Sequence, residues 1–309
     1  MKPIKIGLVG VGAIARSQHI PALRENPLFK LEACASRNAH VEGIDNFASF
    51  EGMLDARPDL DAVTICTPPQ VHYDAARLAL TRGKHVFLEK PPCATTAQLD
   101  HLALLARQSN CVLLQSWHSR HAAAVYATQR MLEGRAVRTI RITWKEDVRQ
   151  WHPGQEWIWR AGGFGVFDPG INALSILTKI LPRAVFVNEA HLYIPENCQA
   201  PIAADLNLST DAGTPIAANF DFRHTGLQTW DIDIETEEGS LRLSEGGNRL
   251  FADGKPVATA EVEGEYPSLY RHFADLVAKG VSDVDARPFQ LVADAFLVGT
   301  RMIVDRFDP

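Results

Sequence analysis

Short apolar runs alternate with amphipathic segments through residues 1–121 of the chain. The runs are rich in Val, Ile, Leu and Ala, which predicts strands that are buried on both faces. The segments between them carry apolar residues at helical spacing, and several end near Pro or Gly, which predicts helices. Strands that alternate with helices form a parallel sheet with helices on both faces. The predicted strands are 4–9, 29–35, 61–66, 85–89 and 111–116, and the predicted helices are 14–24, 47–55, 71–82 and 95–108.

The pattern changes from residue 122 onward. After a predicted crossover helix at 122–133, most apolar runs lie close together with turn residues between them, which predicts a mostly antiparallel sheet. We therefore predict an α/β fold with two domains, in which residues 1–121 form a parallel-sheet domain and residues 122–309 form an α+β domain on an open sheet. The predicted strands are 139–145, 185–192, 203–208, 216–222, 229–236, 240–243 and 256–260, and the predicted helices are 168–180, 267–279 and 289–306.

The segment Gly-Val-Gly-Ala-Ile-Ala at 10–15 joins the first predicted strand to the first predicted helix and fits the pattern G-x-G-x-x-A. Gly10 allows the tight turn, Gly12 lets the main chain approach a pyrophosphate, and Ala15 keeps the helix close to the sheet. Such a pattern is weak evidence alone, but the strand before it and the helix after it supply its context. The segment predicts a Rossmann domain that binds NAD(P), with Ala13 and Ile14 also at the cofactor.

The end of the second predicted strand indicates which dinucleotide is preferred. An NAD-specific Rossmann domain carries an acidic residue here, which accepts hydrogen bonds from the ribose hydroxyls. Residues 35–38 read Ala-Ser-Arg-Asn and contain no carboxylate. An arginine can pair with a 2′-phosphate and a serine can donate to it. We therefore predict NADP in preference to NAD, with Ser36 and Arg37 on the 2′-phosphate; the alternative is that Arg37 is a solvated loop charge.

Ligands of parallel sheets bind at the carboxyl ends of the strands. The remaining predicted cofactor residues lie at or just after such ends, and they are Thr67, Pro68, His72, Glu89 and Lys90. Lys90 is expected close to the nicotinamide, where its amine could take a proton or stabilise an oxyanion. The alternative is an ordinary lysine at a strand end.

Composition and charge exclude several classes of protein. Of 309 residues, 46% are hydrophobic and 22% are charged, which is typical of a globular protein, and the net charge of −6 gives no support for nucleic-acid binding. The five cysteines form no C-x-x-C pair, so we predict neither disulfides nor a metal site. No signal-peptide pattern opens the chain, and no apolar run approaches the roughly 18 residues of a membrane span. We therefore predict a cytoplasmic protein with no membrane partner.

Two strand-end motifs, Thr67-Pro68-Pro69 and Glu89-Lys90-Pro91, add a resemblance to these patterns. With the dinucleotide turn before them, they resemble the glucose-fructose oxidoreductase/inositol dehydrogenase (Gfo/Idh/MocA) family, and the likeness covers the whole chain. That family also carries D-x-G-x-H at the start of a helix in its second domain. Residues 168–172 read Asp-Pro-Gly-Ile-Asn, so Asn172 stands where the family has histidine.

Three segments, 144–149, 151–155 and 168–175, resemble a subgroup of that family, the sugar 1-dehydrogenases that act on L-arabinose or D-galactose. Asn172 is typical of this subgroup. The resemblance implies a monosaccharide substrate, L-arabinose and also D-galactose, whose anomeric carbon is oxidised to an aldonolactone with NADP or NAD. It also implies a possible homodimer through the C-terminal sheet. An inositol or another sugar as substrate, or a non-catalytic cofactor-binding regulator, are the alternatives.

The resemblance implies Lys90, Asp168 and Asn172 as the catalytic residues. Asp168 before a proline is also a standard helix N-cap, and both roles can hold together. Asn172 lies one helical turn further on and cannot act as a base, because an amide has no basic atom at neutral pH. Proton removal falls to Lys90 or Asp168. We favour Asp168 as the acceptor and Lys90 as the group that positions the C1 oxygen.

Five further residues are expected to contact the sugar. His118 follows the fifth predicted strand, and Glu146 ends a strand of the second domain, where it can accept hydrogen bonds from sugar hydroxyls. Trp151, His152 and Trp230 could form an aromatic wall against the C–H face of the ring. Core packing or a subunit contact is the alternative for the tryptophans.

Overall fold

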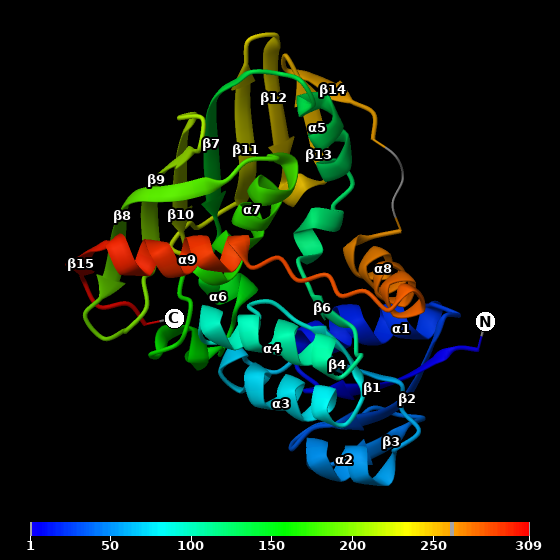
Figure 1. Ribbon diagram of the computed structural model, residues 1–309. Coiled ribbons are helices and arrows are strands. Elements are labelled where there is room, and N and C mark those ends of the chain that lie inside the picture. The colour runs from blue at the N-terminus through cyan, green and yellow to red at the C-terminus, as the bar shows by residue number, and fades with distance from the viewer. Residues whose placement is uncertain (1, 260–262, 309) are drawn as a thin grey trace. The chain divides into compact units, whose positions relative to one another are not determined.

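The computed structural model describes residues 2–259 and 263–308, and these form two compact units (Figure 1). The first unit runs to Trp117 and also includes Glu263–Ala286. The second unit begins at His118 and continues again from Arg287. The compact units therefore do not coincide with the predicted boundary after residue 121, because Glu263–Ala286 packs with the N-terminal sheet.

The sheet of the first unit is parallel throughout and has the order β3-β2-β1-β4-β5-β6. This confirms the predicted α/β class with its nucleotide-binding type of sheet. The short strand β3 was not predicted, because it is only three residues long and largely exposed. The strands are β1 (Ile4–Val9), β2 (Phe29–Ala35), β3 (Asp45–Phe47), β4 (Ala62–Ile65), β5 (His85–Leu88) and β6 (Leu113–Gln115).

Helices cover both faces of this sheet, and α1 and α8 lie side by side in Figure 1. Local sequence explains their starts, since the Ser49 hydroxyl caps α2 and Thr95 forms a capping box at α4. The first helix opens with a π-helical turn, η1. The helical segments are η1 (Ala15–His19), α1 (Ile20–Glu25), α2 (Phe50–Ala56), α3 (Pro69–Thr81), α4 (Thr96–Gln108) and α8 (Glu265–Lys279).

Aromatic packing explains why α8 belongs to the first unit. The Tyr270 ring stacks on Phe87 of β5 at 4.8 Å between centroids and meets the edge of Phe29 of β2 at 5.4 Å. Phe273 packs against the same two rings. Burying large aromatic side chains is among the strongest stabilising contributions to a core. This contact brings a segment from late in the chain onto the dinucleotide-binding sheet.

The second unit is built on a nine-stranded sheet with the order β14-β13-β12-β11-β7-β10-β9-β8-β15. Two pairs, β7 with β10 and β8 with β15, are parallel, and the others are antiparallel, so the predicted open, mostly antiparallel sheet is confirmed. The strands are β7 (Val137–Lys145), β8 (Val185–Pro195), β9 (Ala203–Thr210), β10 (Pro215–Asp221), β11 (Thr229–Thr236), β12 (Gly239–Ser244), β13 (Arg249–Ala252), β14 (Lys255–Val257) and β15 (Thr300–Val304).

Alternation along the strands separates an apolar face of this sheet from a polar one. In β7, Ile140, Ile142 and Trp144 are buried, whereas Arg141 on the other face is exposed. The almost fully buried helix α7 lies on the apolar side. The helical segments of this unit are η2 (His118–His121), α5 (Val125–Leu132), α6 (Val148–Trp151), η3 (Glu156–Trp159), α7 (Phe167–Ile180), η4 (Glu245–Gly247) and α9 (Arg287–Val298).

The predicted helix at 289–306 is wrong in its second half. The helix α9 ends at Val298, and Thr300–Val304 forms the edge strand β15 beside β8. A Cβ at Gly299 would lie 2.8 Å from Leu192 Cδ1, so the chain passes too close to β8 there for a larger residue. Three β-branched residues in the following run, Thr300, Ile303 and Val304, favour the extended chain.

Two smaller predictions also differ from the structure. Strand β13 was missed, and β14 ends at Val257, so the last predicted strand is shorter than 256–260; residue 260 lies outside the described residues. Asp168 is not the N-cap of its helix, because α7 already begins at Phe167 and its cap is Val166. The Asp168 carboxylate is therefore available for contacts other than capping.

Candidate active site

The dinucleotide turn has the geometry that its glycines predict. Gly10 has a φ of +89°, and a Cβ there would lie 2.8 Å from Thr67 Cγ2. A Cβ at Gly12 would meet no atom within 4 Å, so the space above this residue is open. Ala15 is fully buried, which lets η1 approach the sheet. A tight turn below and open space above are what a pyrophosphate against the main chain requires.

The donor atoms around this turn fit an anionic cofactor. The Thr67 hydroxyl, just after β4, is buried and has no hydrogen-bond partner within the described chain. Because a buried polar atom without a partner is costly, a ligand oxygen would satisfy it. Ala13 and Ile14 are exposed at the start of the helix, where they are reachable by a bound molecule. We conclude that the residues present fit a dinucleotide.

Ser36 and Arg37 lie where the sequence predicts, directly after β2. The Ser36 main-chain N–H donates to Phe47 O at 2.9 Å, which fixes the loop, and the Arg37 side chain is exposed. Sequence reasoning missed a second cation here. Arg16 of η1 reaches over the same loop, where its Nη2 donates to His40 O at 3.4 Å. The position of Arg16 in the helix that follows the dinucleotide turn is the signal that could have identified this residue.

Lys90 follows β5, and buried residues hold the main chain on both sides of it. The Glu89 carboxylate accepts from the Lys90 main-chain N–H at 2.7 Å. The His72 ring is fully buried, with Nδ1 at 3.0 Å from Pro91 O and Nε2 against Thr67 O. Burial lowers the pKa of His72, which favours its neutral form. The buried His72 ring thus lies between the main-chain carbonyls of the Thr67 loop and of the segment after Lys90, and its neutral form donates its one N–H to one side.

In the second unit, the side chains of Glu146, His152 and Asp168 lie close together. Glu146 follows β7 and is 3% exposed, while His152 ends the short helix α6. The Glu146 carboxylate accepts from Trp230 Nε1 at 2.7 Å and lies 3.1 Å from His152 Nε2. Both of its oxygens thus already serve protein donors, and Glu146 orients the His152 ring.

The other nitrogen of the His152 ring faces the second carboxylate. His152 Nδ1 lies 3.4 Å from Asp168 Oδ2 and makes no well-aligned hydrogen bond. If His152 Nε2–H donates to the Glu146 carboxylate, a neutral ring presents its Nδ1 lone pair to Asp168. A proton between Nδ1 and the Asp168 carboxylate would give the buried Nδ1 atom a hydrogen-bond partner. The two groups are therefore close enough to share one proton.

Aromatic rings frame these three polar residues. Trp144 and Trp230 are paired across β7 and β11, and their rings stack at 6.0 Å. Trp151 packs against Trp230 at 4.9 Å and is 41% exposed, so it offers a face to a ligand, whereas Trp144 is buried. Phe222, which sequence reasoning missed, contacts the His152 ring at 5.4 Å. Phe222 follows β10 and continues its alternation of buried and exposed residues, which marks it only as a core residue.

His118 and Asn172 are both placed by α7. The Arg120 guanidinium donates to Ser175 O at 2.9 Å and to Thr178 Oγ1 at 2.8 Å, which pins η2 and its first residue, His118, to that helix. Asn172 lies one turn after Asp168 and is half-buried. The helix α7 therefore carries Asp168 and Asn172, two of the predicted catalytic residues. Direct contact of His118 with a substrate stays a prediction.

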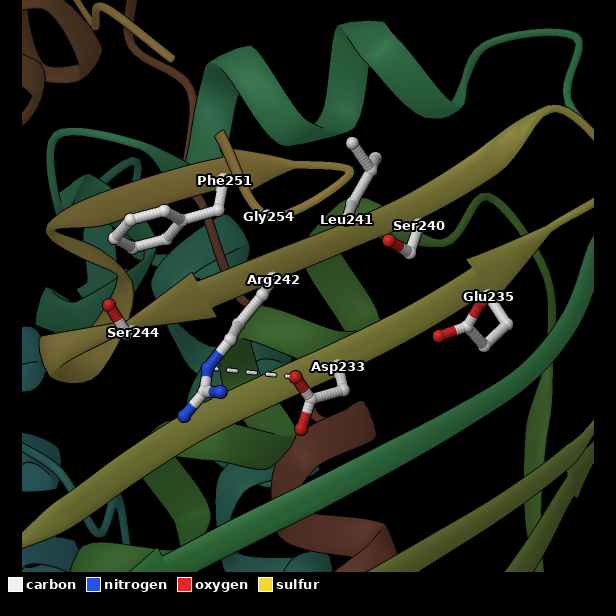
Figure 2. Close-up of a pocket in the computed structure, with 8 residues that line it drawn as sticks. All are labelled: Asp233, Glu235, Ser240, Leu241, Arg242, Ser244, Phe251 and Gly254. Carbon is white, nitrogen blue, oxygen red and sulfur yellow. Dashed lines mark ion pairs between the residues drawn. The ribbon is translucent and has the colours of Figure 1, made fainter. Parts of the chain in front are cut away.

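An open groove of the second unit lies elsewhere, on the polar face of its sheet (Figure 2). Its volume is about 450 Å³, and Figure 2 shows Arg242 on β12 pointing toward Asp233 on β11, an ion pair of 3.6 Å. None of the predicted site residues lines it. The groove is lined by Asp233, Glu235, Ser240, Leu241, Arg242, Ser244, Phe251 and Gly254.

Two absences concern metals and membranes. Within residues 2–259 and 263–308, no cluster of His, Cys, Asp or Glu is arranged to hold a metal ion. Among the helices of the same described ranges, none combines the length and the apolar character that crossing a bilayer demands.

Comparison with known proteins agrees with this geometry. The model of an oxidoreductase family with an NAD-binding Rossmann fold matches residues 4–116. Galactose 1-dehydrogenase of Pseudomonas fluorescens is 46% identical over 307 residues, which cover 99% of both chains. The crystal structure of a D-galactose-1-dehydrogenase from Rhizobium etli is 52% identical, has a TM-score of 0.95, and is matched over 100% of this chain and 99% of its own.

A more distant likeness concerns the fold alone. A 3-ketoreductase from Actinomadura kijaniata, solved with NADP and TDP-benzene, is 20% identical with a TM-score of 0.84. The match covers 98% of this chain and 99% of that one. The two-part architecture is therefore shared well beyond the range of close sequence similarity.

Proposed function

Because this chain belongs to the Gfo/Idh/MocA family of oxidoreductases, we propose that it is an aldose 1-dehydrogenase that oxidises the anomeric carbon of a monosaccharide to the aldonolactone. The substrates that we propose are D-galactose, after which both similar proteins are named, and L-arabinose. The two sugars share their configuration at ring carbons 2, 3 and 4. The observation that carries the proposal is the Glu146–His152–Asp168 cluster under an aromatic rim.

We propose NADP as the preferred cofactor, with NAD as the second. Gly10, Gly12 and Thr67 would hold the pyrophosphate, and Ser36 with Arg37 would hold the 2′-phosphate. When bound, the oxidised nicotinamide supplies the acceptor for the hydride that leaves C1. The first unit provides the main-chain turn and the hydrogen-bond donors that would hold this cofactor.

The reaction also requires removal of the proton from the C1 hydroxyl. In our proposal Asp168 accepts that proton, and His152 Nδ1 then shares it. Glu146 stabilises the charge that develops on the His152 ring, because its buried carboxylate faces Nε2 at 3.1 Å. Lys90 positions the C1 oxygen, and Asn172 donates to or accepts from a neighbouring hydroxyl.

The aromatic rim accounts for binding of the sugar ring. Trp151 and Trp230 present flat surfaces suited to the C–H face of a pyranose. A pocket that reads three hydroxyls rejects an epimer strongly, since a buried polar group then loses its partner. The exocyclic hydroxymethyl group is the one difference between the two proposed sugars.

Absorbance at the reduced-nicotinamide wavelength tests the proposal directly. The purified chain is offered D-galactose, L-arabinose, D-glucose, D-xylose and myo-inositol with NADP and with NAD. We expect turnover of the first two sugars and a kcat/KM at least about a hundredfold lower for the epimer D-glucose. If myo-inositol were oxidised as fast as D-galactose and L-arabinose, an inositol would replace these sugars as the assigned substrate. Tight NADPH binding without any turnover would favour a non-catalytic regulator.

The cofactor preference gives a mutational prediction. Arg37→Asp places a carboxylate against the 2′-phosphate, so the ratio of kcat/KM with NADP to that with NAD should fall by about a hundredfold. The matched control is Arg77→Asp, which makes the same charge change at an exposed position of α3. An unchanged ratio in Arg37→Asp would remove this residue from the 2′-phosphate site.

Three earlier expectations are not tested by any of these observations. A cytoplasmic location and the lack of a nucleic-acid partner stay predictions. The homodimer through the C-terminal sheet also stays a prediction, and the polar face of Figure 2 is the surface that it would use.

A further inference from the structure

Glu89 differs from the other predicted cofactor residues because its carboxylate is buried and both of its oxygens accept hydrogen bonds. The residue is 3% exposed at the end of β5. Its Oε2 accepts from the Lys90 main-chain N–H at 2.7 Å. Its Oε1 faces three more donors, His19 Nε2 at 3.1 Å, the Tyr266 hydroxyl at 3.0 Å and the Ser116 hydroxyl at 3.2 Å. Donors from four separate segments thus converge on one carboxylate.

The contacts continue beyond Glu89 as a buried chain. His19 Nδ1 lies 2.7 Å from the Tyr270 hydroxyl, which lies 3.0 Å from Thr64 Oγ1. One assignment of protons satisfies every link: Thr64 donates to Tyr270, Tyr270 donates to His19, and His19 donates to Glu89. Each of these side chains is fully or almost fully buried. In this assignment the Glu89 carboxylate accepts from His19, Tyr266, Ser116 and the Lys90 main-chain N–H.

The two tyrosines support this assignment. Burial raises the pKa of Tyr266 well above its usual value, and the neighbouring Glu89 charge raises it further. Burial also raises the pKa of Tyr270. Both phenols therefore keep their protons and remain hydrogen-bond donors throughout the range in which the enzyme would work.

The network bears on the proposed chemistry because it holds the main chain at Lys90. The Glu89 contact fixes the main chain at Lys90, and His72 holds the carbonyls of Pro91 and Pro92 on the other side. Main-chain atoms before and after the Lys90 side chain are thus held by buried groups. A catalytic amine needs placement to a fraction of an ångström, because a displacement of about 1 Å can cost a hundredfold in rate.

We propose that Glu89 is a positioning residue that acts through Lys90, and that His19 and Tyr266 hold its carboxylate in place. It makes no direct contact with the cofactor. This inference rests on the proposed function, in which Lys90 positions the C1 oxygen of the sugar. It gives α8 a role at the site, because that helix supplies Tyr266.

The variant Glu89→Gln tests the proposal, since it keeps the side-chain shape and removes the charge. We expect kcat to fall by about 10- to 100-fold, while the Kd for NADPH, measured by fluorescence, changes less than twofold. Tyr266→Phe removes one donor and keeps Glu89, and its kcat should fall by about three- to tenfold. The matched control is Tyr73→Phe, which removes a hydroxyl of α3 that lies 3.0 Å from His101 Nδ1 of α4; its kcat should not change.

A second readout needs no sugar, so it separates this inference from the proposed function. Acylation of Lys90 by acetic anhydride is quantified by peptide mass spectrometry with and without NADPH. Bound NADPH should protect Lys90 in the wild type and in Tyr73→Phe, and the protection should be largely lost in Glu89→Gln and reduced in Tyr266→Phe.

Three results would overturn the inference. The first is equal protection of Lys90 in Glu89→Gln and wild type, which would leave Glu89 a purely structural role. The second is a tenfold weaker NADPH affinity in Glu89→Gln, which would show that the carboxylate contacts the cofactor. The third is a lack of protection in the wild type, which would remove Lys90 from the cofactor site. Failure of the wild type to oxidise any sugar would instead count against the proposed function alone.

Discussion

Replacing Lys90 by methionine should lower kcat by about a thousandfold, with the Kd for NADPH changed only slightly. The reason is that the amine is proposed to act on the C1 oxygen as the proton leaves it, and a lost oxyanion-type donor costs about a hundred- to a thousandfold in kcat. Methionine keeps the apolar stem of the side chain. Steady-state rates with saturating D-galactose and NADP measure the effect.

The matched control for this variant is Lys2→Met, which removes the same charge at an exposed position in the same unit. Its kcat should equal that of the wild type. Thermal midpoints of both variants, read by circular dichroism, exclude unfolding as the cause. If Lys90→Met retained more than a tenth of the wild-type kcat, the residue would have no part in the chemical step.

Replacing Asp168 by asparagine should lower kcat by about a hundred- to ten-thousandfold, because general-base catalysis contributes a factor of that size. Asparagine fills the same space but cannot accept the proton. Since Asp168 is not the N-cap residue of α7, this substitution should remove no capping hydrogen bond and leave the stability of the helix nearly unchanged. The measurement is kcat at saturating sugar and NADP.

The contact between Asp168 and His152 adds a sharper form of this test. If the two share one proton, His152→Gln and Asp168→Asn remove the same function, and the double variant should be little slower than Asp168→Asn alone. Multiplicative effects would mean that the residues act independently. Asp211→Asn, at an exposed position of the same unit, is the control and should keep the wild-type rate.

Local patterns in the sequence predicted much of the first unit. Gly10 and Gly12 were predicted from the spacing of the turn motif, and Gly10 does have the positive φ of +89° that favours glycine. The strand ends before Thr67 and Lys90 were also predicted, since buried parallel strands are continuous apolar runs. The candidate residues at these ends followed from the general rule that ligands bind there.

Predictions failed where a local pattern suits two structures. The segment after Val298 contains apolar residues that fit a helical face as well as a strand, and pairing with β8 decided in favour of the strand. Asp168 before Pro169 fits an N-cap, but α7 begins one residue earlier, at Phe167. In the first case, pairing with a distant strand overrode the local preference.

The sequence by itself determined the fold class, the dinucleotide turn and the identity of the residues that we propose for catalysis. Only the tertiary structure decided how those residues are held. Glu89 meets His19 across 70 positions and Tyr266 across 177, and His152 lies between Glu146 and Asp168. Hydrogen bonds of this kind depend on how strands and helices far apart in the chain pack together, and no periodicity within one segment encodes that packing. The same packing placed Glu263–Ala286 in the first unit.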